Sequence, residues 1–171
     1  MDNIKKGSNL LILGAGQYGK IVWETAKAME CFDRIDFLDD NNPIAIGKLA
    51  DYKTFGAQYT HVFVAIGNAK LRKQWLSILE DASFALPRLI HPQAYISASA
   101  VLGRAIIAEP MAVVNAGATV ETGTLLCAGC VVNHNAHVMS VCQIDCNAVV
   151  AANATVPEGT KVTSCTVYDR E

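Results

Sequence analysis

Residues 112–138 read AVVNAG-ATVETG-TLLCAG-CVVNHN-AHV, and each block carries an apolar residue at its third position. The same spacing continues on both sides of this stretch. Neither the helical period of about 3.6 residues nor the alternation of a strand requires it, so a repeat of six predicts a solenoid. The twelve apolar positions are Ile96, Leu102, Ala108, Val114, Val120, Leu126, Val132, Val138, Ile144, Val150, Val156 and Val162.

A second column of residues supports the solenoid. The residue two places before each apolar position is small in every block except that of Ile106, and small residues fit where a chain turns a corner inside a narrow prism. This pattern resembles that of hexapeptide-repeat proteins, in which three blocks form one triangular coil of a left-handed parallel β-helix. The twelve blocks predict about four coils. The left hand is implied by the resemblance, because parallel connections are usually right-handed.

Composition excludes several partners. The 171 residues suffice for one ordinary domain or two small ones, and the hydrophobic fraction of 51% predicts little disorder. A net charge of −2, with no run rich in lysine and arginine, argues against nucleic acid and anionic membranes. Because the chain starts with polar residues and the apolar run Leu10 to Leu13 is short, we expect no signal peptide or membrane insertion and predict a cytoplasmic protein.

The chain has six cysteines, and Cys127-x-x-Cys130 has the interval of a metal-binding pair. However, Cys130 and Cys142 fall in the column of small residues, where cysteine acts as a small hydrophobic residue. We therefore favour structural cysteines over a metal or redox role and predict no metal site.

The first part of the chain alternates apolar strands with helical segments, which predicts a parallel sheet flanked by helices. Its length allows one mononucleotide-binding half of a Rossmann-like fold. The register of six begins just after His91-Pro92. The predicted fold is thus α/β plus all-β, with a Rossmann-like βαβ domain at 1–90, a β-helix at 91–171, and residues from Ser164 onward outside the repeat. Predicted strands cover 9–13, 34–38, 61–66 and 89–90, predicted helices 21–29 and 69–79, and a short strand and helix lie within 44–55.

Gly14, Gly16 and Gly19 form a Gly-x-Gly-x-x-Gly loop between the first strand and the first helix. Such a loop lets backbone N–H groups approach a phosphate at a helix N-terminus. Asp39, at the end of the second strand, is placed to accept a hydrogen bond from a ribose. The motif favours a nucleotide or nucleotide sugar. The alternatives are glycines that serve close packing alone, and an NAD site, which the missing second half of the fold disfavours.

A second loop at the same end of the sheet, Gly67-Asn68, follows the strand at 61–66. Ligands of open parallel sheets bind at this end. Arg72, one turn into the next helix, is either a phosphate ligand or a solvated surface residue.

His134 is the candidate general base. It stands two places after interior Val132, so its side chain should point out of the prism. An imidazole can deprotonate a sugar amine or hydroxyl that attacks a thioester. The alternative is a surface histidine without function. His137 is expected at the surface or in a trimer contact.

These features together resemble the sugar O- and N-acyltransferases of the sialic-acid O-acetyltransferase and bacillosamine-pathway acetyltransferase type. The motifs are the Gly-x-Gly-x-x-Gly loop, Ile90-His-Pro, hexapeptide repeats with Val-Val-x-His, and Val156-Pro-Glu-Gly-Thr. The resemblance implies a homotrimer, acetyl-CoA as co-substrate and a nucleotide-linked sugar on the N-terminal domain. It also implies His134 as catalytic base. The substrate residues it implies are Gly14, Gly16, Gly19, Asp39, Asp40, Gly67, Asn68 and Arg72, and the acetyl-CoA residues are Asn133, Asn135, Ala151, Ala152 and Asn153.

The sequence also departs from that family's usual pattern. Gln17 and Tyr18 stand in the glycine loop, and Asn135 replaces an acidic residue after the histidine. Cys127 and Gln143 stand where an asparagine and a second histidine are common. The leading hypothesis is an acyl-CoA-dependent acetyltransferase that acts on a nucleotide-linked amino sugar at a trimer interface. The alternatives are a non-catalytic trimeric nucleotide-sugar-binding protein and an NAD enzyme with a solenoid stalk.

Overall fold

The computed structural model describes residue 4, residues 7–82 and residues 84–170. Most of the polar start, on which the expectation about a signal peptide rests, lies outside these ranges. The chain divides into two compact units, Met1–Leu89 and Ile90–Glu171. Within the described ranges no helix has both the length and the apolar character needed to cross a bilayer.

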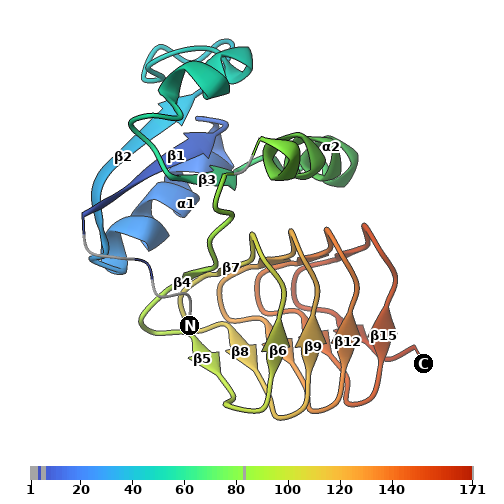
Figure 1. Cartoon of the computed structure of the whole chain (residues 1–171). Coiled ribbons are helices and arrows are strands. Elements are labelled where there is room, and N and C mark those ends of the chain that lie inside the picture. Colours follow the sequence, from blue (N-terminus) through green and yellow to red (C-terminus); the bar gives the residue numbers. More distant parts are fainter. Residues whose placement is uncertain (1–3, 5–6, 83, 171) are drawn as a thin grey trace. The chain divides into compact units, whose positions relative to one another are not determined.

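The N-terminal unit is a three-stranded parallel sheet in which β1 lies between β2 and β3 (Figure 1). Four consecutive residues of β1, Leu10 to Leu13, are fully buried, as expected for the central strand of a sheet covered on both faces. Within 44–55, where a short strand and a helix were expected, the structure has a single parallel bridge between Gly47 and Leu38 and a 3-10 helix. The elements are β1 (Ser8–Leu13), α1 (Gln17–Ala28), β2 (Phe32–Leu38), the 3-10 helix η1 (Leu49–Phe55), β3 (His61–Val64) and α2 (Ala69–Asp81).

The C-terminal unit is a left-handed parallel β-helix built from strands of two residues. Each strand pairs in parallel with strands 18 residues away, as in Val131↔Val113 and Val131↔Val149. Three sheets result, and we name each after its first strand. The β4 face holds β4 (Leu89–Ile90), β7 (Ile107–Ala108), β10 (Leu125–Leu126), β13 (Gln143–Ile144) and β16 (Lys161–Val162).

The other two faces complete the prism, and Figure 1 shows the strands of the β6 face side by side. The β5 face holds β5 (Tyr95–Ile96), β8 (Val113–Val114), β11 (Val131–Val132), β14 (Val149–Val150) and β17 (Val167–Tyr168). The β6 face holds β6 (Val101–Leu102), β9 (Thr119–Val120), β12 (His137–Val138) and β15 (Thr155–Val156).

The predicted interior column is confirmed. From Ala108 to Val162 each of its members is buried, while Ile96 and Leu102 at the first coil are partly buried. The β-helix also includes strands at both ends of the expected repeat. Leu89–Ile90 pairs within the β-helix, and Val167–Tyr168 pairs with β14, so the repeat begins earlier and ends later than expected. Ile90 and Tyr168 keep the register of six, but their polar neighbours made these two blocks hard to recognise in the sequence.

Every corner from residue 105 to residue 165 contains one residue with a left-handed backbone, three places after the interior position, with φ between 51° and 75°. From Gly123 onward its N–H donates to the carbonyl 19 residues earlier, as from Asn135 to Ala116. Glycine and asparagine tolerate this conformation, and they occupy most of these corners. The same left-handed conformation is also adopted by four residues for which it is unfavourable: Ala105, Met111, Val141 and Cys165.

The buried cysteines pack as small residues. Cys130 and Cys142 are fully buried in the column of small residues, and Cys127 is also buried. Burial, together with the nearby charge of Glu109, raises the pKa of the Cys127 and Cys130 thiols far above the ordinary value, which keeps both thiols protonated at neutral pH.

Candidate active site

The three loop glycines have different structural roles. Gly14 has φ +105°, and a Cβ there would lie 2.9 Å from the carbonyl oxygen of Ala65. A Cβ at Gly19 would collide with the carbonyl oxygen of Gly14. Close packing therefore explains Gly14 and Gly19. Gly16, the N-cap of α1, has an ordinary φ of −71° and no neighbouring heavy atom within 4 Å of an added Cβ, so packing does not explain it.

Gly67 matches Gly16 in this respect, because an added Cβ there also meets nothing within 4 Å. Gly16 follows β1 and Gly67 follows β3, and these strands are neighbours in the sheet. The loops are held together where the strands end, since the N–H of Ala65 donates to Leu13 at 2.8 Å and that of Gly14 to Leu38 at 2.8 Å. The carboxyl edge of the sheet thus presents two open stretches of backbone.

Asp39 shapes the glycine loop. Its carboxylate accepts N–H hydrogen bonds from Ala15 at 2.8 Å and from Asn41 and Asn42 at 2.9 Å each. These bonds, that of Ala15 first, lower the pKa of Asp39 below the ordinary value. The Asn42 side chain also donates to the carbonyl of Ala15 at 2.6 Å, a contact that sequence reasoning missed. The backbone N–H and the backbone carbonyl of Ala15 are therefore both held by hydrogen bonds.

Three further predicted substrate residues support the neighbouring loops. Asp40 accepts a hydrogen bond from the N–H of Leu49 at 3.2 Å, and Asn68 caps α2 by accepting from the N–H of Leu71 at 3.0 Å. Arg72 is only 1% exposed, and its guanidinium donates to the carbonyls of Ile66 at 2.8 Å and Gly67 at 3.0 Å. Of the two alternatives for Arg72, the solvated surface residue was wrong, because the guanidinium lies beneath the loop and donates to its carbonyls.

His134 lies at the corner between the β5 and β6 faces, in the turn between β11 and β12, and its side chain is exposed. The predicted acetyl-CoA residues lie at the same corner on two successive coils. Asn153 donates its N–H to the carbonyl of His134 at 3.2 Å, and the Asn135 side chain donates to that of Asn153 at 3.4 Å. Asn133 accepts from the side chain of Asn115 at 3.2 Å. The structure thus brings His134 together with residues 133, 135 and 151–153.

The corner of His134 also carries free backbone donors. At three places on the other two corners, the N–H two places after an interior residue is bound by a carboxylate: Ala128 donates to Glu109, Ser140 to Glu121 and Cys146 to Asp145, at 3.0–3.1 Å. At the corner of His134, Asn115, Asn133 and Ala151 occupy the place of those acids. The N–H groups of Ala116, His134 and Ala152 have no acceptor among the described residues.

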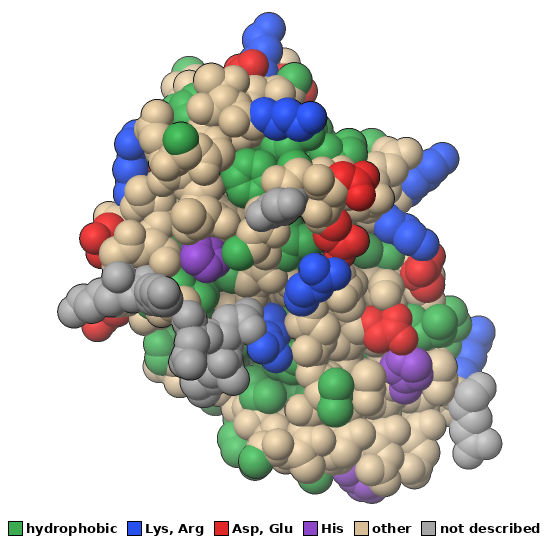
Figure 2. All heavy atoms as spheres, viewed as in Figure 1, with side chains coloured by type: hydrophobic (Ala, Val, Ile, Leu, Met, Phe, Trp, Pro, Cys, Tyr) green, Lys and Arg blue, Asp and Glu red, His purple; other side chains and the backbone are tan. Residues whose placement is uncertain are grey.

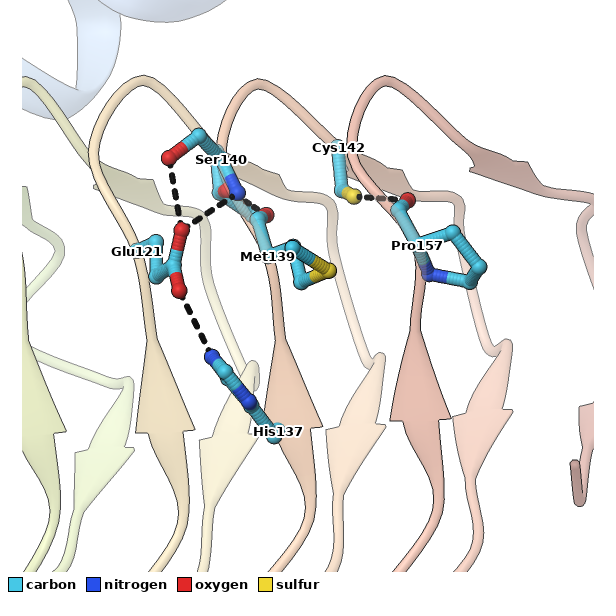
Figure 3. A network of polar contacts seen from close by, with 7 residues as sticks. Glu121, His137, Met139, Ser140, Cys142 and Pro157 are labelled. Atoms are coloured by element: carbon cyan, nitrogen blue, oxygen red, sulfur yellow. Dashed lines mark hydrogen bonds and ion pairs between the residues drawn. The ribbon is translucent and has the colours of Figure 1, made fainter. Parts of the chain in front are cut away.

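His137 belongs to a different cluster, on the β6 face (Figure 3). Its Nε2 lies 2.7 Å from Glu121, whose other carboxylate oxygen accepts hydrogen bonds from the hydroxyl of Ser140 at 2.7 Å and its N–H at 3.0 Å. The Ser140 hydroxyl, followed by His137, lowers the pKa of Glu121. This network joins two successive coils and is partly exposed to solvent.

The outward residues of the β5 face form an apolar column. Tyr95 is 58% and Val167 is 65% exposed, and the three valines between them are partly exposed. The column consists of Tyr95, Val113, Val131, Val149 and Val167. Figure 2 shows lysine, arginine and acidic side chains interspersed over the visible described surface. A continuous apolar stripe of this kind is typical of a surface that another protein covers.

Comparison with known proteins identifies the class of protein that this chain resembles. The chain is similar to the acetyltransferase domain of PglB from Neisseria gonorrhoeae FA1090, with 28% identity, a TM-score of 0.91, and coverage of 96% of this chain and 83% of that one. The same domain in complex with acetyl coenzyme A matches with a TM-score of 0.90. The resemblance to hexapeptide-repeat sugar acetyltransferases is thereby confirmed.

The N-terminal unit matches a particular family: residues 9–79 fit the one described as the PglD N-terminal domain. Two more distant structures share the fold. PerB from Caulobacter crescentus, in complex with CoA and GDP-perosamine, has 20% identity and a TM-score of 0.72 over 95% of this chain and 92% of that one. WeeI from Acinetobacter baumannii AYE has 15% identity and a TM-score of 0.58 over 90% and 93%.

Proposed function

We propose that this protein transfers an acetyl group from acetyl-CoA to the amino group of a nucleotide-linked sugar, with His134 as general base. The observation that carries the proposal is the corner at which exposed His134 lies one coil away from the unpaired N–H of Ala152. A base and an oxyanion donor are the two groups that acyl transfer requires. The 28% identity to an acetyltransferase domain that binds acetyl coenzyme A supports the donor substrate.

The N-terminal unit supplies a fitting site for the acceptor. The backbone at Gly16 and Gly67 is open, and Gly16 begins α1, whose N-terminal N–H groups favour a phosphate. Asp39 and Arg72 hold these loops in place through the contacts described above. We infer that the diphosphate of the nucleotide sugar lies against the N-terminus of α1.

His134 takes a proton from the sugar amine while the nitrogen of that amine attacks the thioester carbonyl. The N–H of Ala152 donates to the oxygen that becomes negative in the tetrahedral intermediate. When the intermediate collapses, the carbon–sulfur bond breaks, and His134 can return the proton to the departing CoA sulfur. The protein forms no covalent bond to the acetyl group in this scheme.

We propose that the active protein is a homotrimer. The apolar column of the β5 face is a surface for a neighbouring copy, and closed cyclic symmetry is the norm for soluble oligomers. The corner of His134 borders this face, so a neighbouring copy would cover one side of the site and exclude water from it.

The test is acetyl-CoA consumption by the full chain with UDP-, CMP-, dTDP- and GDP-linked amino sugars. We expect turnover with at least one of them, a fall of about 10²- to 10⁴-fold in His134→Ala, and retained turnover in His137→Gln. Equal turnover in His134→Ala would remove the base from the proposal. Calorimetric heat with a nucleotide sugar but none with acetyl-CoA would instead establish a non-catalytic binding protein.

A further inference from the structure

Two exposed cysteines are stacked at the corner between the β4 and β5 faces. Cys146 lies in the turn between β13 and β14, and Cys165 lies in the turn of the next coil, between β16 and β17. The backbone N–H of Cys165 donates to the carbonyl oxygen of Cys146 at 3.0 Å. These residues, 19 apart in sequence, are therefore direct neighbours across the coil spacing.

The backbone of Cys165 directs its side chain toward the coil of Cys146. Its φ of +58° matches the +57° of Asn135 and the +55° of Asn147. The side-chain oxygens of those asparagines occupy the space above Gly117 and Gly129, each in the preceding coil. A left-handed corner residue thus extends its side chain back over the residue 18 places before it. For Cys165 that residue is Asn147, the neighbour of Cys146 in the preceding coil.

The spacing suits a disulfide. A disulfide joins Cα atoms roughly 4.4–6.8 Å apart. Neighbouring parallel strands lie about 4.8 Å apart, and Cys146 is offset by one residue from Asn147, which lies opposite Cys165, so the pair stays within that range. The other cysteines are less accessible. Cys127, Cys130 and Cys142 are buried and Cys31 is partly buried in the N-terminal unit, so among the described cysteines an oxidant in solution reaches Cys146 and Cys165 most readily.

We propose that Cys146 and Cys165 form a reversible intramolecular disulfide by exchange with a low-molecular-weight disulfide such as oxidised glutathione. The thiolate of one cysteine attacks the glutathione disulfide, forms a mixed disulfide and releases one glutathione thiolate. The thiolate of the second cysteine then attacks the protein sulfur of that mixed disulfide and releases the second glutathione. Two protein thiols are oxidised and one glutathione disulfide is reduced to two thiols.

The bond would tie the last coil to the one before it. In the described part of the chain β17 pairs with β14 on one side, so it is the edge strand of the β5 face. Cross-linking its turn to that of the preceding coil restricts the unfolded chain. The oxidised protein should therefore hold the end of the β-helix more firmly than the reduced protein.

The experiment incubates the full chain with mixtures of reduced and oxidised glutathione, blocks remaining thiols by alkylation, and maps tryptic peptides without reduction. Trypsin cleaves after Lys161, so the disulfide joins peptide 105–161 to peptide 162–170. Fragmentation of the linked pair identifies the cysteine within 105–161. We expect a pair that a reductant separates, that persists in Cys127→Ser, and that is lost in Cys146→Ser and Cys165→Ser.

A thermal readout accompanies the mapping. Oxidation should raise the Tm of the wild-type chain and of Cys127→Ser, and this rise should vanish in Cys146→Ser. The proposal is overturned if the linked pair persists in Cys146→Ser, if both thiols stay open to alkylation in the most oxidising mixture, or if the bond joins two chains on a non-reducing gel.

Discussion

The carbonyl oxygen of His134 accepts a hydrogen bond of 3.2 Å from the backbone N–H of Asn153, and this bond places the N–H of Ala152 one coil away from the histidine. Proline at position 152 would delete that N–H. Pro92 and Pro110 already stand at the same place in the repeat, two residues after an interior position, so the backbone accepts proline there. We expect Ala152→Pro to fold normally and to lower kcat by about 10²- to 10³-fold.

Ala116→Pro is the matched control for this variant. It removes the equivalent N–H at the same corner, one coil before His134. Steady-state kinetics should show near wild-type kcat in Ala116→Pro. A similar loss in both variants would mean that proline disturbs the corner and that no specific oxyanion donor was removed.

Gly16 and Gly19 should respond differently to the same substitution. Gly16→Ala places its Cβ in open space, so it should leave stability unchanged and lower the affinity for the nucleotide sugar about tenfold or more by obstructing the close approach of the phosphate. Gly19→Ala forces its Cβ onto the carbonyl of Gly14 and should cost about 2 kcal/mol of unfolding free energy. Calorimetry and denaturant titration measure the two effects. Unaltered affinity in Gly16→Ala would place the ligand elsewhere.

A charge in the apolar column should disrupt assembly. Val131 lies at the middle of the β5 face, with its outward side chain partly exposed. Val131→Lys places an ammonium group in the proposed contact, and we expect light scattering to fall from three chain masses to one, with loss of activity. Thr163→Lys, at an exposed corner position, is the control and should remain trimeric. A Val131→Lys variant that is still trimeric would exclude the β5 face from the interface.

The Glu121 network predicts a dependence of stability on pH. The pKa of Glu121 is lowered in the folded protein, so its contribution is fully present above the ordinary carboxyl value of 4.5 and is lost as the pH falls through the lowered value. Because the carboxylate is partly exposed, we expect Glu121→Gln to cost about 1 kcal/mol at pH 7. Urea titrations should show the difference from wild type shrink at acidic pH. A difference independent of pH would contradict this linkage.

Met111 offers a stabilising substitution. It is 65% exposed and has φ +63°, so its side chain adds backbone strain and little burial. Met111→Gly should raise the free energy of unfolding by about 1 kcal/mol. Met139→Gly, at a corner position without a left-handed backbone, should lower it instead. Thermal unfolding with a denaturant series measures whether each substitution raises or lowers the free energy of unfolding.

The register of six in the sequence was sufficient to predict the β-helix, its interior column and the outward position of His134. A period of that length repeats the same environment at each coil, so burial follows position directly. The ends of the repeat were harder to locate. Ile90 and Tyr168 keep the register, but they stand among residues that do not resemble the other blocks.

The sequence by itself thus determined the fold and grouped the candidate residues, because periodic burial is a local and repeated property. Tertiary structure alone decided what individual polar groups do. Arg72 is buried beneath the loop after β3, and the carboxylate of Asp39 accepts hydrogen bonds from three backbone N–H groups. The unpaired N–H of Ala152 and the contact between Cys146 and Cys165 depend on which coils lie next to each other. Residues of successive coils are about 18 positions apart along the chain, and only the stacking of the coils brings them within hydrogen-bond distance.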